Sequence, residues 1–544
     1  MNKIEIKKKI IIALEKIAKK LKLFKSPFLI EPKTHADFAT NFAIINKSEN
    51  KTPMQLAEEI VKLLLKDKKE LFISNIEIAM PGFINIFLDK QYFVDSVNDI
   101  IKLGSNYGKG KKGGELNIEW VSANPTGYLH VGHARNAAIG SVVANICEFA
   151  GVHVTREYYI NDAGNQINML AESIFARYQQ IFNKKFPMPE ESYKGSDIVW
   201  AAEEFHKRYG DKYKDAKLEG EILEFFKTEG TNLFLEEIRK DLENFGMKFD
   251  IWFSEKSLYA NDREVIKQTI KNLKNTYEKD GATWLKTTIH GDDKDRVLVK
   301  SDGDLTYFMP DIAYHNIKFS RTKETPVLIN VWGADHSGYI KRMKCAMEDL
   351  GWDPNRLIVL CMQLVRLVKN GEEYKMSKRK GTSFYLREFV DLVGVDNARF
   401  ILLDRTYNSK LDFDIDIATK KTNDNPVILI QYANARANAL LNKANIKDLT
   451  KLKAVKFDNE NDYKLISVLM EFPEIIDRSA DLYLTNLLTQ YMIKLAKEFN
   501  SWYSNTPKTI GSENETSLLS LVYATSTILE TGMRLLGLTI TKKM

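Results

Sequence analysis

Cysteine is scarce in this chain. Only Cys147, Cys345 and Cys361 occur among 544 residues, with no C-x-x-C pair and no histidine cluster at metal-ligand spacing. Disulfide frameworks and structural zinc sites both need cysteines that are paired or clustered at short spacing. The sequence therefore predicts no disulfide bonds and no structural zinc.

Long hydrophobic runs are also absent. A membrane-spanning helix needs roughly 18 or more apolar residues in succession, and no run approaches that length. The lysine-rich N-terminus is similar to the start of a signal peptide, but its apolar stretch at residues 10–14 is short and is followed by Glu15 and Lys16. We therefore expect no membrane association and no export, and a cytoplasmic location.

Neither sign of charge dominates the composition. The chain has 79 basic and 73 acidic residues, a formal net charge of +6, with 44% hydrophobic and 28% charged residues. This balance is typical of a globular protein and permits an anionic partner without proving one. Positive runs lie at residues 7–9, 109–112 and 375–380, and each alone would be a solvated surface. At about 150 residues per domain, the length predicts three or four domains.

The chain begins with a helical pattern. Apolar residues from Ile6 to Leu21 recur at helical spacing with lysines opposite, which predicts an amphipathic helix over residues 4–21, packed on a small domain of its own. We expect this domain to end in the glycine-rich, basic stretch at 104–114. That stretch contains GKGKKG, a formal match to a dinucleotide-binding fingerprint. It precedes a strand instead of following one, which disfavours the dinucleotide interpretation.

The pattern changes at residue 116. A strand at 116–123, a helix at 133–150 and a strand at 152–160 predict a β-α-β unit. Charged helical sequence follows over 165–280, strand patterns recur near 283–300, 327–332 and 357–368, and helical periodicity dominates after about residue 386. We predict an α/β fold with these parts: a small N-terminal α+β domain (1–108), a doubly wound parallel sheet (109–385) with an insertion at roughly 165–300, and an all-α bundle (386–544).

The sharpest local signal is His130-Val131-Gly132-His133, at the point where a turn passes into a helix. With 8 histidines and 28 glycines in the chain, chance predicts roughly 0.006 copies of H-x-G-H. A helix N-terminus presents unpaired N–H groups to phosphate, two imidazoles add donors, and glycine allows a close approach of a ring or phosphate. The alternative is that one or both histidines pack in the core.

The second signal is the segment KMSKRKG at 375–381. Activation of a carboxylate by ATP needs cationic and N–H donors around the negative charge that develops on the phosphates during transfer. Lysines on a glycine-flanked loop supply such donors. Taken alone, the segment could equally be a solvated basic loop. The two motifs would converge only at the crevice where the two halves of a doubly wound sheet meet.

Together HVGH and KMSKR resemble the two signatures of the class I aminoacyl-tRNA synthetases. Over nearly the whole chain the detail resembles the bacterial type of arginyl-tRNA synthetase, in EWVSANPTGYLHVGHARNAAIG, YYINDAGNQI, LTYFMPDIAYH, GADH and KMSKRKG. The resemblance implies a Rossmann-type catalytic domain, an N-terminal domain that touches the tRNA elbow and a C-terminal anticodon-binding bundle. It implies activation of L-arginine with ATP and Mg²⁺, followed by transfer of arginine to tRNA(Arg). We expect a monomer.

The resemblance also implies roles for individual residues. The implied catalytic residues are His130, Gly132, His133, Lys375 and Lys378. The implied ATP-binding residues lie in and before the first motif and in the second: Ala123, Asn124, Pro125, Thr126, Gly127, Leu129, His130, Gly132, His133, Met376, Ser377 and Lys378. The implied arginine-binding residues are Glu119, Ser122, Asn124, Tyr307 and Asp311, with Asp311 as guanidinium partner.

Physical chemistry gives separate support for carboxylates in this pocket, because a guanidinium presents a planar fork of N–H donors that carboxylates accept. Each of these carboxylates alone is as often a surface or capping residue. Some family members carry a glutamine where this chain has Gly333 to His336, so that contact is not carried over.

The stretches that would face tRNA match more weakly. In the bundle the candidates are Gln431, Tyr432, Asn434 and Arg436 in QYANAR, and Trp502 in FNSWYSN, since aromatic side chains stack on unpaired bases. In the N-terminal domain, HADFATNFA resembles the family's elbow-contacting segment, which implies Phe38 and Asn41. Core packing is the equal alternative for Tyr432 and Trp502.

Two rival functions remain at this point. Another class I synthetase, such as the cysteine enzyme, would carry a cysteine-rich zinc site, which is missing here. A non-catalytic tRNA-binding protein of the same fold would be expected to have lost histidines or lysines from the signatures, and both signatures are intact.

Overall fold

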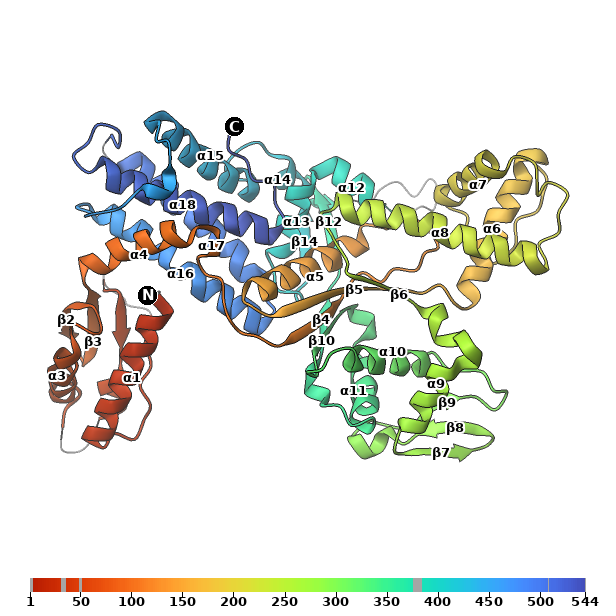
Figure 1. Cartoon of the computed structure of the whole chain (residues 1–544), viewed down its shortest axis with the longest axis horizontal. Coiled ribbons are helices and arrows are strands. Elements are labelled where there is room, and N and C mark those ends of the chain that lie inside the picture. The colour runs from red at the N-terminus through yellow and green to blue at the C-terminus, as the bar shows by residue number, and fades with distance from the viewer. Residues whose placement is uncertain (1–2, 31–35, 48–50, 375–383, 507, 544) are drawn as a thin grey trace.

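The computed structural model describes residues 3–30, 36–47, 51–374, 384–506 and 508–543. Figure 1 shows an extended molecule in which a small N-terminal domain, coloured red, hangs from one end of a blue helical bundle. A parallel sheet lies beside the bundle, and two further lobes project from the sheet on the far side. In the described part of the chain, no helix is long and apolar enough to cross a bilayer.

A five-stranded parallel sheet forms the centre of the molecule. Its spatial order is β11-β10-β4-β5-β6, with all four pairings parallel. The strands are β4 (Glu115–Glu119), β5 (His153–Ile160), β6 (Ile251–Ser254), β10 (Val327–Gly333) and β11 (Leu357–Met362). The chain runs outward from β4 in one direction and from β10 in the other, so the sheet is doubly wound with its switch point between these two strands. The predicted fold class is confirmed.

Three helices connect the strands of this sheet. Helix α5 (Gly132–Phe149) joins β4 to β5, as the β-α-β pattern predicted, and α10 (Phe308–Ser320) and α11 (Tyr339–Asp349) flank β10. Most of α5 is buried, since its alanines and Gly140 pack against the sheet and Trp120. The residues that open α5 and α10 therefore lie at the carboxyl edge of the sheet.

The span predicted as one insertion holds a strand of the central sheet. Helices α6 (Asn165–Phe182), α7 (Ser196–Tyr209) and α8 (Gly220–Asn244) form one lobe with its own core, and β6 then pairs with β5. A second lobe follows, in which α9 (Ala260–Asn272) precedes an antiparallel sheet of β7 (Thr276–Lys279), β8 (Ala282–Leu285) and β9 (Arg296–Val299). The strand pattern near 283–300 thus belongs to this separate sheet.

The N-terminal domain packs helices on a three-stranded antiparallel sheet of order β1-β3-β2. Its elements are α1 (Lys3–Leu21), β1 (Phe38–Thr40), α2 (Phe42–Ile45), α3 (Pro53–Leu64), β2 (Ile73–Ala79), β3 (Phe83–Leu88) and α4 (Lys90–Leu103). Ile6, Ile10 and Leu14 are fully buried, as the helical spacing predicted for residues 4–21. Helix α1 also contacts the bundle, where Lys7 pairs with Glu474 at 3.1 Å.

The C-terminal part is helical except at its start. A small sheet of order β13-β12-β14 precedes the bundle, built from β12 (Val365–Lys369), β13 (Glu372–Glu373) and β14 (Leu411–Asp414), with α12 (Leu386–Val393), α13 (Val395–Leu403) and α14 (Ile415–Thr419) beside it. Strand β14 lies within the span predicted to be all helical. The bundle itself consists of α15 (Pro426–Ala444), α16 (Glu460–Leu482), α17 (Asn486–Asn505) and α18 (Glu515–Leu536).

Candidate active site

A strained turn leaves the carboxyl end of β4. Val121 and Ser122 have φ angles of 65° and 43°, a region that a β-branched residue rarely adopts. The Asn136 side chain accepts from the Val121 amide and donates to the Val331 carbonyl, both at 2.8 Å. These bonds tie the turn to α5 and β10, and strain held in this way at the end of a strand is typical of a functional site.

The HVGH motif forms the entry to α5. Two backbone bonds join it to the segment after the KMSKR motif: Val131 donates to the Phe384 carbonyl at 2.8 Å and Leu386 donates to the Leu129 carbonyl at 2.7 Å. The rings of His130 and His133 lie 3.9 Å apart, tilted by 32°. Both imidazoles therefore lie together at the N-terminus of this 18-residue helix.

Both histidines are held in the neutral form. Burial lowers the pKa of His130, and burial together with the neighbouring His130 lowers the pKa of His133 to about 3. A neutral imidazole still donates one N–H, so the pair offers hydrogen-bond donors at neutral pH without adding cations.

Gly132 leaves room for the ring of His130. A Cβ atom at this position would lie 2.9 Å from two atoms of that ring. Gly132 was predicted to allow the close approach of a ligand ring or phosphate, and the structure places the imidazole of His130 beside it.

Two cavities meet at this histidine pair. A cavity of about 970 Å³ lies on the side of β10, and one of about 390 Å³ lies toward the first inserted lobe. His130 and His133 line both. The smaller cavity contains most of the predicted ATP-binding residues: Ala123, Asn124, Thr126, Gly127 and Leu129. Pro125 is buried and does not line it, and Gly132 lines the larger cavity.

The larger cavity brings together the predicted arginine-binding residues Glu119, Ser122, Tyr307 and Asp311. Asn124 lines the neighbouring cavity instead. Tyr307 is 93% exposed, so it lies at the rim.

The two carboxylates differ in their surroundings. The Tyr339 hydroxyl donates to Asp311 Oδ2 at 2.6 Å, and burial raises the pKa of Asp311 to about 7. Glu119 accepts from the Ser122 hydroxyl at 3.0 Å and from the Lys318 ammonium at 2.8 Å.

The second motif lies outside the described residues, so the structure does not test Lys375, Met376, Ser377 or Lys378. Its two flanks are described. Tyr374 and Phe384 both line a groove of about 1150 Å³ that also contains Val131 of the first motif. The residues on either side of the second motif therefore lie beside the first motif.

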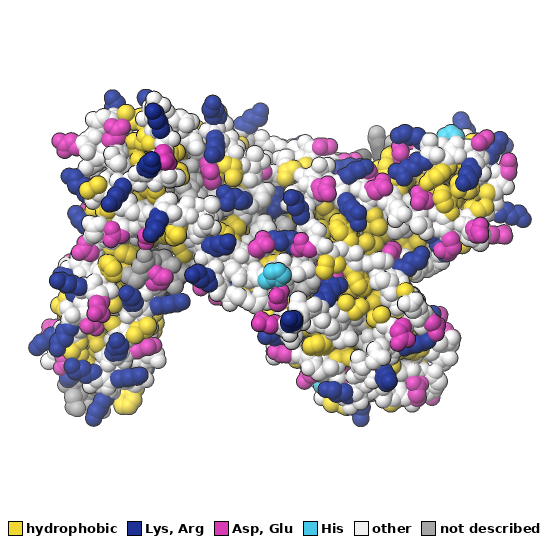
Figure 2. All heavy atoms as spheres, in the orientation of Figure 1, with side chains coloured by type: hydrophobic (Ala, Val, Ile, Leu, Met, Phe, Trp, Pro, Cys, Tyr) yellow, Lys and Arg dark blue, Asp and Glu magenta, His cyan; other side chains and the backbone are white. Residues whose placement is uncertain are grey.

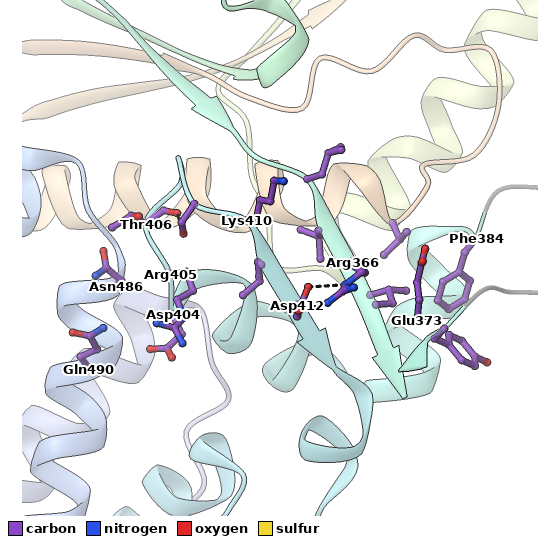
Figure 3. A pocket seen from close by; sticks show the side chains of 17 residues that line it. Arg366, Glu373, Phe384, Asp404, Arg405, Thr406, Lys410, Asp412, Asn486 and Gln490 are labelled. Carbon is purple, nitrogen blue, oxygen red and sulfur yellow. Dashed lines mark hydrogen bonds and ion pairs between the residues drawn. The ribbon is translucent and has the colours of Figure 1, made fainter. Parts of the chain in front are cut away.

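Figure 3 shows this groove between the small sheet and helix α17. Arg366 on β12 pairs with Asp412 on β14 at 2.9 Å, while Arg405 and Lys410 are exposed on the loop that leads into β14. Asn486 and Gln490 line the groove from α17. The groove thus runs from the first motif to the helical bundle and is lined by charged and amide side chains.

The predicted tRNA contact of two residues is wrong, because both side chains are buried. Trp502 is 1% exposed, and its indole N–H donates to Asp462 at 2.7 Å, so it belongs to the bundle core. Phe38 on β1 is buried in the N-terminal core. Neither side chain is accessible for stacking on a base. Neighbouring Gln431 and Asn434 are also buried and bond to Thr539 and Thr541 carbonyls.

Tyr432 and Arg436 have the opposite placement. Tyr432 is 37% exposed, and the Arg436 guanidinium lies 4.5 Å from its ring and 4.6 Å from the ring of Tyr503. Two exposed aromatic rings and a cation thus form one surface cluster on α15 and α17.

In the N-terminal domain, Asn41 is partly buried at the start of α2. Figure 2 shows many lysine and arginine side chains on the visible face of the N-terminal domain.

Several residues that line the cavities had no signal in the sequence: Tyr339 lines the larger cavity, and Asp197 and Tyr385 line the smaller one. Tyr159 also lines the larger cavity, and it lies in the YYINDAGNQI stretch. Asp197 belongs to the inserted lobe, where it accepts from the Tyr128 amide at 3.4 Å. Its position beside the first motif follows only from the packing of α7. Among the described residues, no group of three or more His, Cys, Asp or Glu could hold a metal ion.

Three family models match the chain. The model described as tRNA synthetases class I (R), catalytic domain, matches residues 97–466. The Arginyl tRNA synthetase N terminal domain matches residues 4–88, and the DALR anticodon binding domain matches residues 430–544. Together they cover the N-terminal domain, the central sheet with its lobes, and the bundle.

Known proteins match over similar lengths. An arginine–tRNA ligase of Metamycoplasma arthritidis is 48% identical over 99% of this chain and 100% of its own length, and one of Bacillus licheniformis is 43% identical over 94% and 93%. A putative arginyl-tRNA synthetase structure from Campylobacter jejuni is 34% identical with a TM-score of 0.77, covering 84% of this chain and 100% of its own. The Thermus thermophilus arginyl-tRNA synthetase structure, at 20% identity and a TM-score of 0.73 over 99% of this chain and 100% of its own, shares the fold.

Proposed function

This chain belongs to the arginyl-tRNA synthetases of class I, and from that membership we propose how its two cavities divide the reaction between them. The enzyme activates L-arginine with ATP to arginyl-adenylate and pyrophosphate, then transfers arginine to the 3′-terminal ribose of its tRNA and releases AMP. The larger cavity holds arginine and the smaller one holds ATP. His130 and His133, which line both, lie where the carboxylate of one substrate meets the α-phosphate of the other.

Asp311 binds the guanidinium in this proposal. It lies partly buried at the start of α10, and the hydroxyl of Tyr339 fixes its orientation. Glu119 and Ser122 hold the α-amino end of arginine. Asn124 lies at the junction with the ATP cavity, and Tyr307 covers the rim of the arginine cavity. Charge-assisted hydrogen bonds are worth about 1.5 to 3 kcal/mol each, so two or three of them select a forked cation over neutral side chains. Such selection needs no hydrolytic editing site.

The adenylation step places negative charge on the transferred phosphate and on the departing pyrophosphate. His130, His133 and the first amides of α5 donate hydrogen bonds to this charge, and neutral imidazoles do so without a change of protonation state. Lys375 and Lys378 clamp the departing phosphates, and Met376 and Ser377 contribute to ATP binding. Mg²⁺ enters with ATP and is held mainly by its phosphates.

The tRNA runs from the N-terminal domain to the bundle in this proposal. The cluster of Tyr432 and Arg436 reads the anticodon region, since aromatic rings stack on unpaired bases. Arg405 and Lys410 in the groove of Figure 3 meet backbone phosphates, and Asn41 contacts the elbow. The domains are 1–108, 109–385 and 386–544, and the enzyme works in the cytoplasm as a monomer.

One observation carries the assignment: two cavities of the size of small substrates share the neutral histidine pair at a helix N-terminus. ATP–pyrophosphate exchange against each of the twenty amino acids, with and without tRNA, tests it. Exchange with arginine alone supports the guanidinium pocket. Exchange with another amino acid contradicts the assignment of Asp311.

The variant His133→Ala tests the role of the histidines. Removal of one preorganised donor costs about 10² to 10³ in kcat, and the arginine KM should change by less than about threefold. His153→Ala is the matched control, because His153 is exposed at the amino end of β5 and pairs only with Glu115 in the described structure. Exchange by the His133 variant at the parental rate would show that His133 has no catalytic role.

A further inference from the structure

A lysine lies completely buried beneath the proposed arginine cavity. Lys318 on α10 is 0% exposed, and its ammonium donates to Glu119 Oε2 and to Asn330 Oδ1, both at 2.8 Å. The ammonium also lies 4.7 Å from the ring of Tyr314. Glu119 and Asn330 are register partners on β4 and β10, so the lysine bridges the two strands at the switch point of the sheet.

The hydrogen bonds continue beyond Asn330. Its Nδ2 atom donates to His315 Nε2 at 2.6 Å, because Oδ1 of the same amide accepts from Lys318. His315 then carries its proton on Nδ1, which donates to the Asp311 carbonyl at 2.8 Å. Burial and the nearby ammonium lower the pKa of His315 to about 3, which agrees with this neutral tautomer.

A continuous buried chain of polar groups therefore connects the two acidic residues of the arginine cavity. It runs from Glu119 through Lys318, Asn330 and His315 to the backbone of Asp311. Burial of an ammonium costs several kcal/mol, and a well-packed apolar side chain is often the more stable choice at such a position. A buried cation at this place is therefore better explained by what it does to Glu119 than by stability.

We propose that Lys318 is a positioning residue for arginine recognition, which acts through Glu119 and is itself held by Asn330 in the chain that leads to the backbone of Asp311. The inference rests on the proposed arginine cavity. Lys318 does not touch arginine. It holds Oε2 of Glu119, so that Oε1, with Ser122, faces the cavity.

Lys318→Met in the full-length enzyme tests the proposal by steady-state aminoacylation. Loss of a charge-assisted bond to Glu119 should raise the arginine KM by about tenfold or more, while the ATP KM and kcat change by less than about threefold. Lys318→Arg retains the cation and should recover part of the arginine KM. An unchanged arginine KM, or equal increases in the KM of arginine and ATP, would overturn the proposal.

A double-mutant cycle separates positioning from folding. Removal of both members of a buried ion pair is often nearly neutral for stability, so Glu119→Gln/Lys318→Met should fold even if the single lysine variant does not. Because Lys318 acts through Glu119, its substitution should add less than about twofold to the arginine KM of Glu119→Gln. Additive effects would contradict the inference.

Single variants of the two acidic residues of the cavity distinguish this inference from the function on which it rests. If Glu119→Gln and Asp311→Asn both leave the arginine KM unchanged, the proposed cavity is wrong. If both raise the KM and Lys318→Met does not, the cavity stands and only the positioning role of Lys318 fails.

Discussion

Asp311 is a carboxyl group whose ionisation depends on its ligand. Burial raises its pKa to about 7, while the hydrogen bond from Tyr339 opposes this shift. Below pH 7 the free enzyme therefore holds a neutral acid at the bottom of the proposed guanidinium site. A guanidinium needs the carboxylate, so the binding of arginine must release this proton at low pH.

This linkage predicts the pH dependence of the arginine KM. Since only the ionised form binds, the KM should rise by about tenfold for each pH unit below about 7 and stay constant above it. Tyr339→Phe removes the bond that lowers the pKa of Asp311, so the rise should begin at higher pH. Asp311→Asn should give a high KM without this pH dependence. The ATP KM, measured in the same assays, is the control, and a flat arginine profile between about pH 5.5 and 8 would contradict the model.

For individual residues, the sequence predicted the type of side chain at the site better than the direction in which that side chain faces. HVGH could be predicted because its histidines, its glycine and the helix that they open are adjacent in the chain. Trp502 was assigned to tRNA from its type, yet it is buried and bonded to Asp462, while its neighbour Tyr503 is partly exposed beside Arg436. The inward spacing of Leu495, Phe499 and Trp502 along α17 was the available signal that Trp502 faces the core.

The turn between β4 and α5 is the element that joins the two cavities. Its non-glycine residues at positive φ carry a conformational cost of about 1–3 kcal/mol each, which surrounding bonds must offset. Asn136 supplies two of these bonds from the second turn of α5. The Asn136 amide thus helps to hold the turn, together with the Ser122 hydroxyl, which accepts from the Tyr159 amide and donates to Glu119.

Asn136→Ala should therefore loosen this turn. It leaves the Val121 N–H and the Val331 carbonyl without their partner, at about 1–3 kcal/mol for each buried group. We expect kcat/KM for arginine to fall by about 10- to 100-fold. Asn145→Ala is the control, since Asn145 lies on the same helix and donates to the distant Leu535 carbonyl. Equal losses of activity in both variants would refute a specific role for Asn136.

The elements that sequence reasoning misplaced are those defined by distant partners. Strand β6 has only four residues, IWFS, and it lies between two inserted segments. It becomes part of the central sheet through pairing with β5, about 90 residues earlier in the chain. Strand β14 is likewise short and pairs with β12 across two helices. Helices α1, α5, α15 and α17 were predictable because their apolar periodicity is local.

On the scale of the whole molecule, one buried arginine joins the bundle to the central sheet. Arg399 on α13 donates to the Phe245 carbonyl at 2.7 Å, to the Leu536 carbonyl at 3.1 Å and to the Ser141 hydroxyl at 3.0 Å. These acceptors lie after α8, at the end of α18 and within α5. Burial lowers the pKa of Arg399 to about 10, so it remains charged at neutral pH. This side chain therefore helps to fix the helical bundle relative to the central sheet, together with the bond from Asn145 to the Leu535 carbonyl.

Arg399→Met should lower the temperature at which the bundle separates from the central sheet. The substitution keeps an apolar stem but leaves buried acceptors unsatisfied, at a cost of about 3 kcal/mol or more. Because a chain of several domains has no single unfolding midpoint, the measurement is the half-life of aminoacylation activity at a fixed elevated temperature. We expect the half-life to shorten by about 100-fold. Arg208→Met removes a partly exposed arginine that pairs with Glu236 on the first inserted lobe, and its half-life should stay within about twofold of the parent. If both variants lose activity at the same rate, Arg399 does not hold the bundle to the sheet, and their relative orientation depends on other contacts, such as apolar packing and the bond from Asn145 to the Leu535 carbonyl.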